Sequence, residues 1–442
     1  MAVASFSKIM RPATLQKNVK EWIEEHDKEF KVLPWPPNSP DLSPIEHLVG
    51  CAGKTSTNHG GPASQLTGLK GSAAKVSVQD TRGHLQRSCE VHASMGQSCF
   101  GGTRGTNTSV ELQEIAADMF GMEAALFIPT GTMSNLIAVM VHCRERGDEI
   151  IVGDLSHLHI YEQGGSAQLA GVHSTTVTNL PDGTFDLDQL VSKIRHGYPD
   201  PHYPRTRLIC LENTHNIQGG RVLPLLFLQE VRAVADKYGL AVHMDGARVM
   251  NAAVAQGVPP STILQHTHTV SVCLSKGLGA PVGTMLGGPR DFISRAVRCR
   301  KSLGGGMRQA GILAAAGKLS LGEMVGRLEE DHRNAKIFAQ AVLDCDPPLY
   351  SVDMAGVETN ILRFRVRDHR LTPSDFCTRM AQVGEGEEAE LGQGVQVLMF
   401  PHVGGSVRAV WHLGISQEDT HLAIQKLKLV ARQFSKERNR AQ

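Results

Sequence analysis

The hydrophobic pattern of this chain becomes regular only from about residue 108 onward. From there to about residue 321, short runs that are apolar on both faces alternate with segments of helical period. Such runs are typical of strands that are buried on both faces of a sheet. They are Ala124–Ile128, Ile150–Val152, Leu208–Leu211, Leu240–His243 and Val270–Leu274. The alternation predicts an α/β fold with a mostly parallel sheet covered by helices on both sides.

Two helices in this region have recognisable ends. Thr108 and Glu111 fit a capping box, and apolar residues follow at helical spacing until Gly121, which can end the helix. A second helix is predicted over Leu226–Tyr238, directly before Gly239.

The pattern changes after about residue 325. A long polar helix is predicted over Met324–Val342, and strands over Asn360–Val366, Val395–Phe400 and Ser406–Leu413. The last of these runs alternates strictly, which predicts a half-buried antiparallel strand. A helix over Gln417–Phe434 completes a small α+β domain.

The first 107 residues lack a sustained pattern, and the segment 51–107 is rich in glycine, serine and threonine. We expect that segment to be an atypical arm that remains disordered, because it has little to bury. The predicted divisions of the chain are therefore 1–50, 51–107, 108–325 and 326–442.

The composition is that of an ordinary globular protein, with 41% hydrophobic and 20% charged residues. A net charge of +1 provides no electrostatic basis for binding nucleic acid or an anionic membrane, so neither is predicted as a partner. The nine cysteines include no CxxC pair, which predicts no metal site and a reducing compartment. We expect the cytoplasm; four basic residues and no acid in residues 1–20 leave mitochondrial targeting open.

Polar side chains directly follow each of the five predicted strands. They are Thr130, Gly131 and Thr132 after the first strand, His157 after the second, His215 after the third, Asp245 and Arg248 after the fourth, and Lys276 after the fifth. Because ligands bind at the carboxyl ends of parallel strands, we expect these residues to lie together. Any one of them alone is more often structural than functional.

This set of side chains suits a pyridoxal phosphate site. A Gly-Thr turn between strand and helix offers N–H groups to a phosphate. An aspartate can hold a protonated pyridine nitrogen, and a lysine can condense with an aldehyde. A histidine can stack on a flat ring or move a proton.

Six segments, in this order and spacing, closely resemble the low-specificity L-threonine aldolases: ALFIPTGTMSN, SHLHIYEQGG, LENTHN, HMDGARVMNA, SVCLSKGLGAPVG and RKSLGGGMRQ. The resemblance runs from about Ser109 to Phe434. It implies the aspartate-aminotransferase-like fold (fold type I), with a seven-stranded type of sheet. It also implies cleavage of L-threonine or L-allo-threonine to glycine and acetaldehyde.

The resemblance further implies a role for each residue. Lys276 is similar to the lysine that condenses with the cofactor, Asp245 to the partner of the pyridine nitrogen, His157 to the ring that stacks on the cofactor, and His215 to the histidine near the substrate hydroxyl. Gly131 and Thr132 resemble the residues that bind the cofactor phosphate. Arg308 resembles an arginine that reaches a phosphate from a neighbouring subunit, and Lys301 lies near it. Arg248 and Arg408 resemble the pair that binds the substrate carboxylate. A homodimer or homotetramer that acts on a small amino acid is implied.

A stretch near the N-terminus has a different resemblance. SPDLSPIEHL and the residues before it are similar to the region around the last catalytic carboxylate of mariner-type transposases, which would be Glu46. Cleavage by two metal ions needs further carboxylates, and residues 1–50 hold six basic against seven acidic residues. We interpret this segment as a transposase remnant without activity on DNA.

The family's N-terminal arm has a D-x-R-S-D-T-V-T segment whose serine helps bind the substrate carboxylate. This chain instead has VSVQDTRG at Val76–Gly83 and CFGGTRGTN at Cys99–Asn107, where Ser77 or Thr81 could stand in. Three interpretations stay open: an active aldolase, a β-eliminating lyase of the same fold, and a catalytically impaired cofactor-binding fusion protein.

Overall fold

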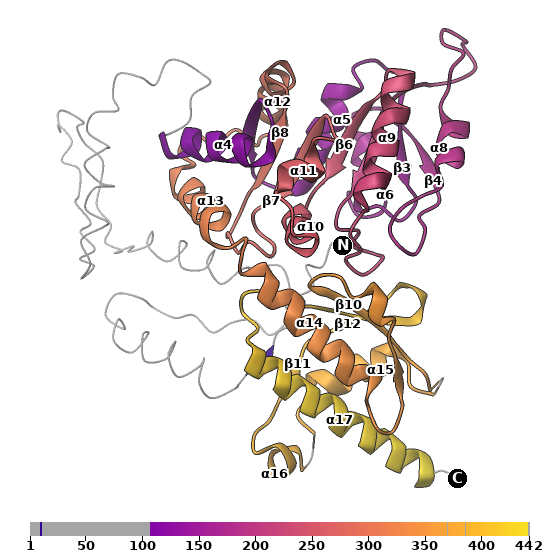
Figure 1. Cartoon of the computed structure of the whole chain (residues 1–442), viewed down its shortest axis with the longest axis vertical. Coiled ribbons are helices and arrows are strands. Elements are labelled where there is room, and N and C mark those ends of the chain that lie inside the picture. Colours follow the sequence, from indigo (N-terminus) through magenta and orange to yellow (C-terminus); the bar gives the residue numbers. More distant parts are fainter. Residues whose placement is uncertain (1–8, 11–106, 369, 385, 441–442) are drawn as a thin grey trace, which may run out of the picture. The chain divides into compact units, whose positions relative to one another are not determined.

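A computed structural model describes residues 9–10, 107–368, 370–384 and 386–440. Within them the chain forms a larger domain on a seven-stranded sheet and a smaller C-terminal domain on a four-stranded sheet (Figure 1). The transposase-like segment, apart from Ile9 and Met10, and the atypical arm lie outside the described residues, apart from Asn107 at its end.

The seven-stranded sheet confirms the predicted fold class. Its strands, in spatial order, are β2 (Ala124–Ile128), β8 (Thr284–Gly288), β7 (Thr269–Cys273), β6 (Ala241–Asp245), β5 (Arg205–Glu212), β3 (Asp148–Gly153) and β4 (His173–Val177). Only β8 runs antiparallel to its neighbours, so the strands on either side of it point the same way. The pattern missed β4, which is partly exposed, and β8, whose sequence is TMLGG.

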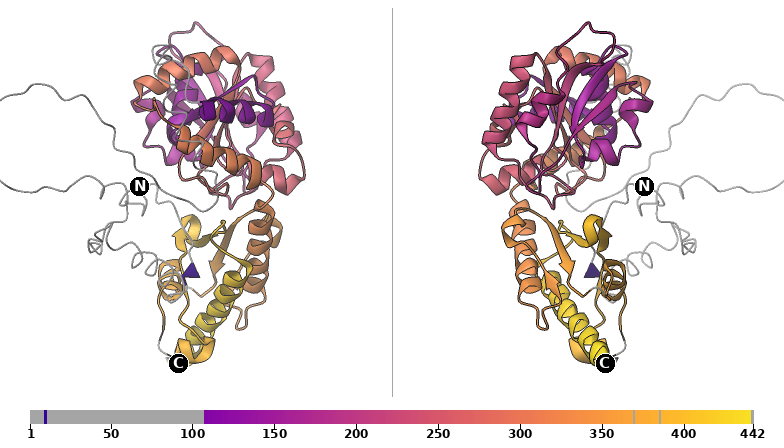
Figure 2. Two further views of the ribbon diagram at one scale, coloured as in Figure 1. Left: turned by 90° about the vertical axis from the view of Figure 1, so that its left-hand side faces the viewer. Right: turned by 90° about the vertical axis from the view of Figure 1, so that its right-hand side faces the viewer.

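Helices cover both faces of this sheet (Figure 2). One apolar cluster joins the sheet to α4 (Asn107–Phe120), α9 (Leu225–Tyr238), α10 (Val249–Gln256) and α13 (Gly311–Glu323). Another joins it to α5 (Gly131–His142) and α12 (Arg290–Ser302). Shorter helices of the domain are α6 (His157–Ile160), α7 (Gly165–Gln168), α8 (Leu187–Lys193) and α11 (Pro260–Leu264). Consecutive side chains of β2 enter opposite clusters, as a strand buried on both faces requires.

The predicted helix ends are close to the observed ones. Helix α4 begins at Asn107, so Thr108 lies in its first turn and is not the cap residue. Gly121 and Gly239 follow α4 and α9 with φ of 66° and 65°, a left-handed conformation that glycine adopts at low cost.

The small domain contains an antiparallel sheet in the order β12 (Phe400–His402), β13 (Ser406–Val410), β10 (Ile361–Val366) and β9 (Tyr350–Ser351). Its helices are α14 (Leu328–Leu343), α15 (Pro373–Ala381), α16 (Glu387–Leu391) and α17 (Gln417–Arg440). The run Val395–Phe400 is not one strand. Its middle forms β11 (Gln396–Val397), which pairs with β1 (Ile9–Met10), and its last residue begins β12.

The expectation that β13 is half-buried was wrong, because all five of its residues are buried. Strands β10 and β12 pair with both of its edges. The guanidinium of Arg408, only 4% exposed, is covered by Asn216 of the large domain. The alternation of residue types therefore reflects a polar site and not a solvent face.

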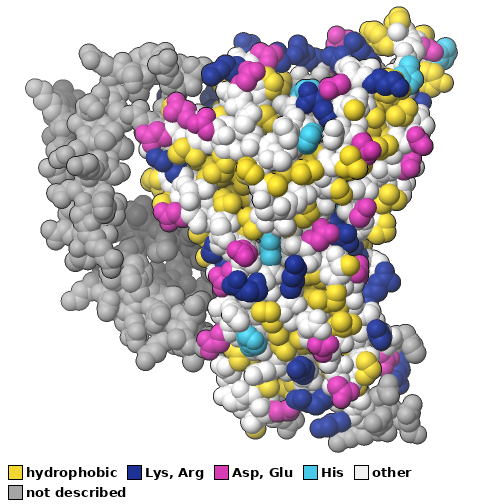
Figure 3. Space-filling view, viewed as in Figure 1, with side chains coloured by type: hydrophobic (Ala, Val, Ile, Leu, Met, Phe, Trp, Pro, Cys, Tyr) yellow, Lys and Arg dark blue, Asp and Glu magenta, His cyan; other side chains and the backbone are white. Residues whose placement is uncertain are grey.

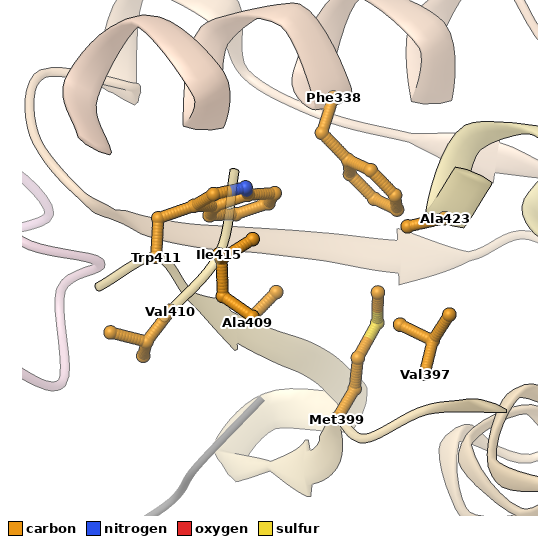
Figure 4. Close-up of a pocket in the computed structure, with 8 residues that line it drawn as sticks. All are labelled: Phe338, Val397, Met399, Ala409, Val410, Trp411, Ile415 and Ala423. Atoms are coloured by element: carbon orange, nitrogen blue, oxygen red, sulfur yellow. The ribbon is translucent and has the colours of Figure 1, made fainter. Parts of the chain in front are cut away.

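A cavity of about 20 Å³ lies in the core of the small domain (Figure 4). The side chains that line it are apolar: Phe338, Val397, Met399, Ala409, Val410, Trp411, Ile415 and Ala423. The space is about that of one water molecule, without polar partners for it. It is a packing gap and is far too small for an amino-acid substrate.

Candidate functional site

The structure brings the five predicted strand ends to one edge of the large sheet. Strands β3, β5, β6 and β7 are parallel, and β2 points the same way on the far side of β8. Glu212 and Asp245 are paired residues on neighbouring strands, as are Asp245 and Ser271. Residues far apart in the sequence thus face the same space.

Helix α5 begins at this edge. The Thr130 side chain caps it by accepting a hydrogen bond from the Met133 N–H at 3.2 Å. A Cβ on Gly131 would lie only 2.8 Å from Cys273 Sγ, so the close approach of β7 requires glycine there. The backbone N–H groups in the first turn of a helix have no carbonyl acceptor within that helix. Together with the helix dipole, those of α5 are suited to bind a phosphate.

Asp245 is buried at the end of β6. Its Oδ1 accepts from the Ala247 N–H at 3.1 Å, and its Oδ2 accepts from Asn135 Nδ2 at 3.0 Å. The carboxylate is therefore held on both oxygens. Asn135, on α5, lies within the TGTMSN segment, but nothing in the sequence distinguished its role.

The ring of His157 is half-buried beside this carboxylate. Its Nδ1 lies 3.1 Å from Glu162 Oε1, and its backbone N–H donates to Glu212 Oε2 at 2.7 Å. Burial alone would lower the pKa of His157, but the hydrogen bond to Glu162 and the nearby carboxylates outweigh it and raise that pKa. Polar atoms of His157, Glu162 and Asp245 lie within 4.8 Å of one another.

Two arginines meet at the junction of the two domains. Arg408 Nη2 donates to Asn216 Oδ1 at 2.7 Å, and Arg248 Nη1 lies 3.5 Å from the same oxygen. Burial and the charge of Arg248 lower the pKa of Arg408 to about 9, and burial lowers the pKa of Arg248. Two adjacent guanidinium groups, one buried and one half-buried, favour an anion between them. Asn216 lies in LENTHN, whose position after β5 was the only signal for it.

His215 is buried in the loop after β5. Its Nδ1 accepts a long hydrogen bond, 3.4 Å, from the Gln218 N–H, while its buried Nε2 has no partner among the described residues. The ring makes no hydrogen bond to Asp245, His157 or Lys276.

The remaining predicted residues are less enclosed. Lys276 is half-buried in the loop after β7, and its ammonium makes no hydrogen bond or ion pair within the part of the chain that the structure describes. Lys301 and Arg308 are exposed at the end of α12 and in the glycine-rich loop after it. Neither makes a hydrogen bond or ion pair with the other predicted site residues within the described ranges.

Comparison with known proteins indicates the family of this chain. Residues 81–366 match the model of the beta-eliminating lyase family. The chain is 42% identical to low-specificity L-threonine aldolase 1 of Arabidopsis thaliana over 72% of this chain and 85% of that protein. It is 41% identical to the low specificity L-threonine aldolase of Escherichia coli K12 over 74% of this chain and 89% of that protein.

Solved structures share the fold at lower identity. A threonine aldolase of Leishmania major superposes with a TM-score of 0.60 at 18% identity, covering 78% of this chain and 95% of that one. An aromatic aminotransferase of Pyrococcus horikoshii gives a TM-score of 0.56 at 17% identity, covering 81% and 94%. From the sequence matches, the chain belongs to the beta-eliminating lyase family, together with the low-specificity L-threonine aldolases.

Proposed function

We propose that this protein is a pyridoxal phosphate-dependent aldolase that cleaves the Cα–Cβ bond of L-threonine and L-allo-threonine to glycine and acetaldehyde. The observation that carries the proposal is the pair of adjacent arginines, Arg248 and Arg408, at Asn216, on the same sheet edge as Asp245 and Lys276. The identity of about 40% to threonine aldolases supports it.

The residues present fit the cofactor. The first turn of α5, with Gly131 and Thr132, would hold the phosphate; Asp245 would hold the ring nitrogen, and Lys276 the aldehyde carbon. The buried Asp245 carboxylate, held on both oxygens, is an acceptor prepared for a cationic N–H. When bound, pyridoxal phosphate supplies an electron sink for the pair of electrons that the breaking bond releases.

The protein's own side chains orient the substrate and move its proton. Arg248 and Arg408 bind the α-carboxylate and so limit rotation about the bonds of Cα. The proton of the β-hydroxyl must leave as the Cα–Cβ bond breaks. His157 or His215 accepts that proton, directly or through a water.

We also propose a homodimer or homotetramer in which Arg308 and Lys301 reach the phosphate of a neighbouring subunit. Helix α13 begins just after Arg308 and bears Ile312, which is 87% exposed, and Leu319, which is 58% exposed. Hydrophobic side chains gather on the face of the large domain over α13 (Figure 3). A surface of this kind is typical of a contact with another subunit.

The finer assignments for the rest of the chain are proposals as well. We interpret residues 1–50 as a transposase remnant that takes no part in catalysis, and we expect no nucleic acid partner. No helix in the described ranges has the length and apolar character needed to cross a bilayer. The six described cysteines are free thiols, which supports the cytoplasm or the mitochondrial matrix as the compartment.

The decisive experiment supplies L-threonine to the purified full-length protein and measures glycine and acetaldehyde. A β-eliminating lyase, the alternative that the family's name favours, would instead release ammonia and 2-oxobutanoate. Lys276→Ala is the matched control and should make neither pair of products. Cofactor bound without any product would indicate the impaired protein, and the proposed activity would then be wrong.

A further inference from the structure

A buried hydrogen-bond chain lies behind the proposed cofactor site, and Asn135 is at its centre. Asn135 is only 1% exposed, and both hydrogens of its amide are used. Its Nδ2 donates to Glu162 Oε1 at 2.9 Å and to Asp245 Oδ2 at 3.0 Å. Because carboxylates accept hydrogen bonds, the amide nitrogen must face them, which fixes the orientation of the amide. Asn135 therefore ties the two carboxylates together.

The chain continues on the other side of Asn135. Its Oδ1 lies 3.1 Å from His243 Nε2, and His243 Nδ1 lies 2.9 Å from Thr269 Oγ1. Thr269 Oγ1 is also 2.9 Å from His142 Nε2. Burial lowers the pKa of His243 to about 4 and that of His142 to about 3, so both rings are neutral near pH 7.

Because both histidine rings are neutral, all hydrogen bonds of this network can point in only one direction. Asn135 Oδ1 can only accept, so His243 carries its hydrogen on Nε2 and accepts at Nδ1 from the Thr269 hydroxyl. That hydroxyl oxygen in turn accepts from the Nε2–H of His142. Every bond then points towards Glu162 and Asp245, which are the acceptors at the end of the chain.

The last link reaches His157. Glu162 Oε1 also lies 3.1 Å from His157 Nδ1, so Nδ1 carries a hydrogen that it donates to the carboxylate. Burial raises the pKa of Glu162, as does the charge of Asp245, while the hydrogen bonds from His157 and Asn135 oppose this rise. The ionisable groups facing the His157 ring are Glu162, Asp245 and Glu212, with Tyr161 at 5.5 Å between ring centres.

We propose that Asn135 and Glu162 are positioning residues for the proposed reaction: Asn135 holds the Asp245 carboxylate, and Glu162 keeps the His157 hydrogen on Nδ1. His157 Nε2 is then the ring atom that has a free lone pair to offer. The inference rests on the proposed function, because holding Asp245 and His157 matters only if a pyridine ring and an amino acid occupy this site.

The alternative is that this network only stabilises the fold. Without Asn135, the Glu162 and Asp245 carboxylates would face each other in a buried site without a donor between them, and one would bind a proton more readily. A protonated or rotated Asp245 would bind a cationic ring nitrogen less well. A merely structural role would leave both cofactor affinity and the His157 tautomer unchanged.

The test begins with cofactor-free, full-length protein labelled with nitrogen-15 in histidine. Nitrogen NMR reports which ring nitrogen bears hydrogen, and the His157 signals are identified by their loss in His157→Asn. At a pH at which the His157 ring is neutral, we expect hydrogen on Nδ1 in the parent protein and a mixture of tautomers in Glu162→Gln. This measurement needs neither substrate nor cofactor.

The second measurement is the Kd for pyridoxal phosphate by equilibrium dialysis. Asn135→Ala should raise that Kd about tenfold, the effect of losing a hydrogen bond to a charged group. Asn360→Ala is the matched control: Asn360 is also buried, but it lies in the small domain, and its Nδ2 donates to the Trp411 carbonyl at 2.9 Å and not to a carboxylate. Its Kd should equal that of the parent.

Two results would overturn the inference. One is a neutral His157 with its hydrogen on Nε2 in the parent, which requires no variant to fold. The other is a folded Asn135→Ala protein that binds the cofactor as tightly as Asn360→Ala. Either result together with acetaldehyde formation by the parent would leave the proposed function standing. If the parent shows the Nδ1 tautomer and Asn135→Ala binds the cofactor more weakly, but the parent forms no acetaldehyde, only the proposed function would be rejected.

Discussion

At the scale of the residue, the site is built from side chains whose partners lie far away in the sequence. Asn216 accepts from Arg408, which is 192 positions away, and lies within 3.5 Å of Arg248. A single amide oxygen thus gathers two guanidinium groups that would otherwise repel each other. We infer that Asn216 prepares the clamp before the substrate arrives.

Replacing Asn216 tests this inference. Asn216→Ala should raise KM for L-threonine about tenfold with a smaller change in kcat, because both arginines regain freedom that binding must remove. Steady-state acetaldehyde release gives both constants. Gln218→Ala, in the same loop and without a side-chain hydrogen bond among the described residues, should resemble the parent. A KM that stays constant or falls in Asn216→Ala would reject this role.

At the scale of the element, α13 has a face that its own subunit leaves uncovered. Ile312 and Leu319 are seven positions apart, so they lie on one side of the helix. The loop with Arg308 leads into this helix, so that the exposed apolar face and the proposed phosphate ligand are neighbours. Association through α13 would therefore deliver Arg308 to another subunit.

Placing a charge on this face should separate the subunits. We expect Ile312→Glu to sediment as a monomer at micromolar concentration and to retain less cofactor, since a buried unpaired carboxylate is costly. Leu226→Glu serves as the control, because Leu226 is 65% exposed on α9 and has no such neighbours in the proposal. An Ile312→Glu protein that remains a dimer would contradict the assignment of the interface to α13.

Helix α14 offers a prediction about pH. Asp331 is fully buried in its first turn and binds Arg327 at 2.6 Å, yet burial raises its pKa from 3.8 to about 6. The folded protein therefore binds this proton more tightly than the unfolded chain does. The contribution of protonated Asp331 to the free energy of unfolding is fully present below about pH 4 and is lost as the pH rises through 6.

Asp331→Asn removes this titration. Between pH 5 and pH 8, the free energy of unfolding of the variant should rise relative to the parent by about 1–2 kcal/mol. Urea unfolding at the two pH values measures the change, and the loss of the Arg327 pair cancels as a constant offset. Glu329→Gln changes an exposed carboxylate of the same turn and should show no relative change. If the difference in the free energy of unfolding between Asp331→Asn and the parent did not change with pH, the buried carboxylate would be ionised across this range.

At the scale of the whole molecule, the described domains act as one unit around the loop after β5. Arg221 pairs with Glu358 at 2.9 Å, and Thr359 donates to the Gly220 carbonyl at 2.7 Å. The proposed carboxylate clamp likewise takes Arg248 from the large domain and Arg408 from the small one. Under the proposed function, substrate binding would then depend on how these two domains are joined.

The N-terminal segment should matter far less. Within the described structure, deleting residues 1–50 removes the two-residue pairing of β1 with β11 and the contact of β1 with α17. We expect the cofactor content to be unchanged and the Tm to fall by about 2 °C or less, which corresponds to under about 1 kcal/mol. Absorbance of bound cofactor and thermal unfolding of both proteins measure the effect. A loss of cofactor would reject the interpretation of this segment as a remnant.

The sequence by itself determined the class of fold and the candidates for chemistry. Strands that are apolar on both faces leave a local signature, and the residues that follow them are fixed in place by chain connectivity. Local pattern and chain order are therefore enough to single out Lys276, Asp245 and His157. The same signature was too weak for β4 at the exposed edge and for β8 with its two glycines.

Only the tertiary structure decided which side chains touch one another. Asn135 bonds to Glu162, His243 and Asp245, which are 27, 108 and 110 positions away, and no local pattern encodes such contacts. The alternation around Arg408 is that of a solvent-facing strand, yet the loop after β5 covers this side chain. Hydrophobic periodicity records how much apolar surface a segment must bury, whereas hydrogen-bond partners depend on which segments the fold brings together.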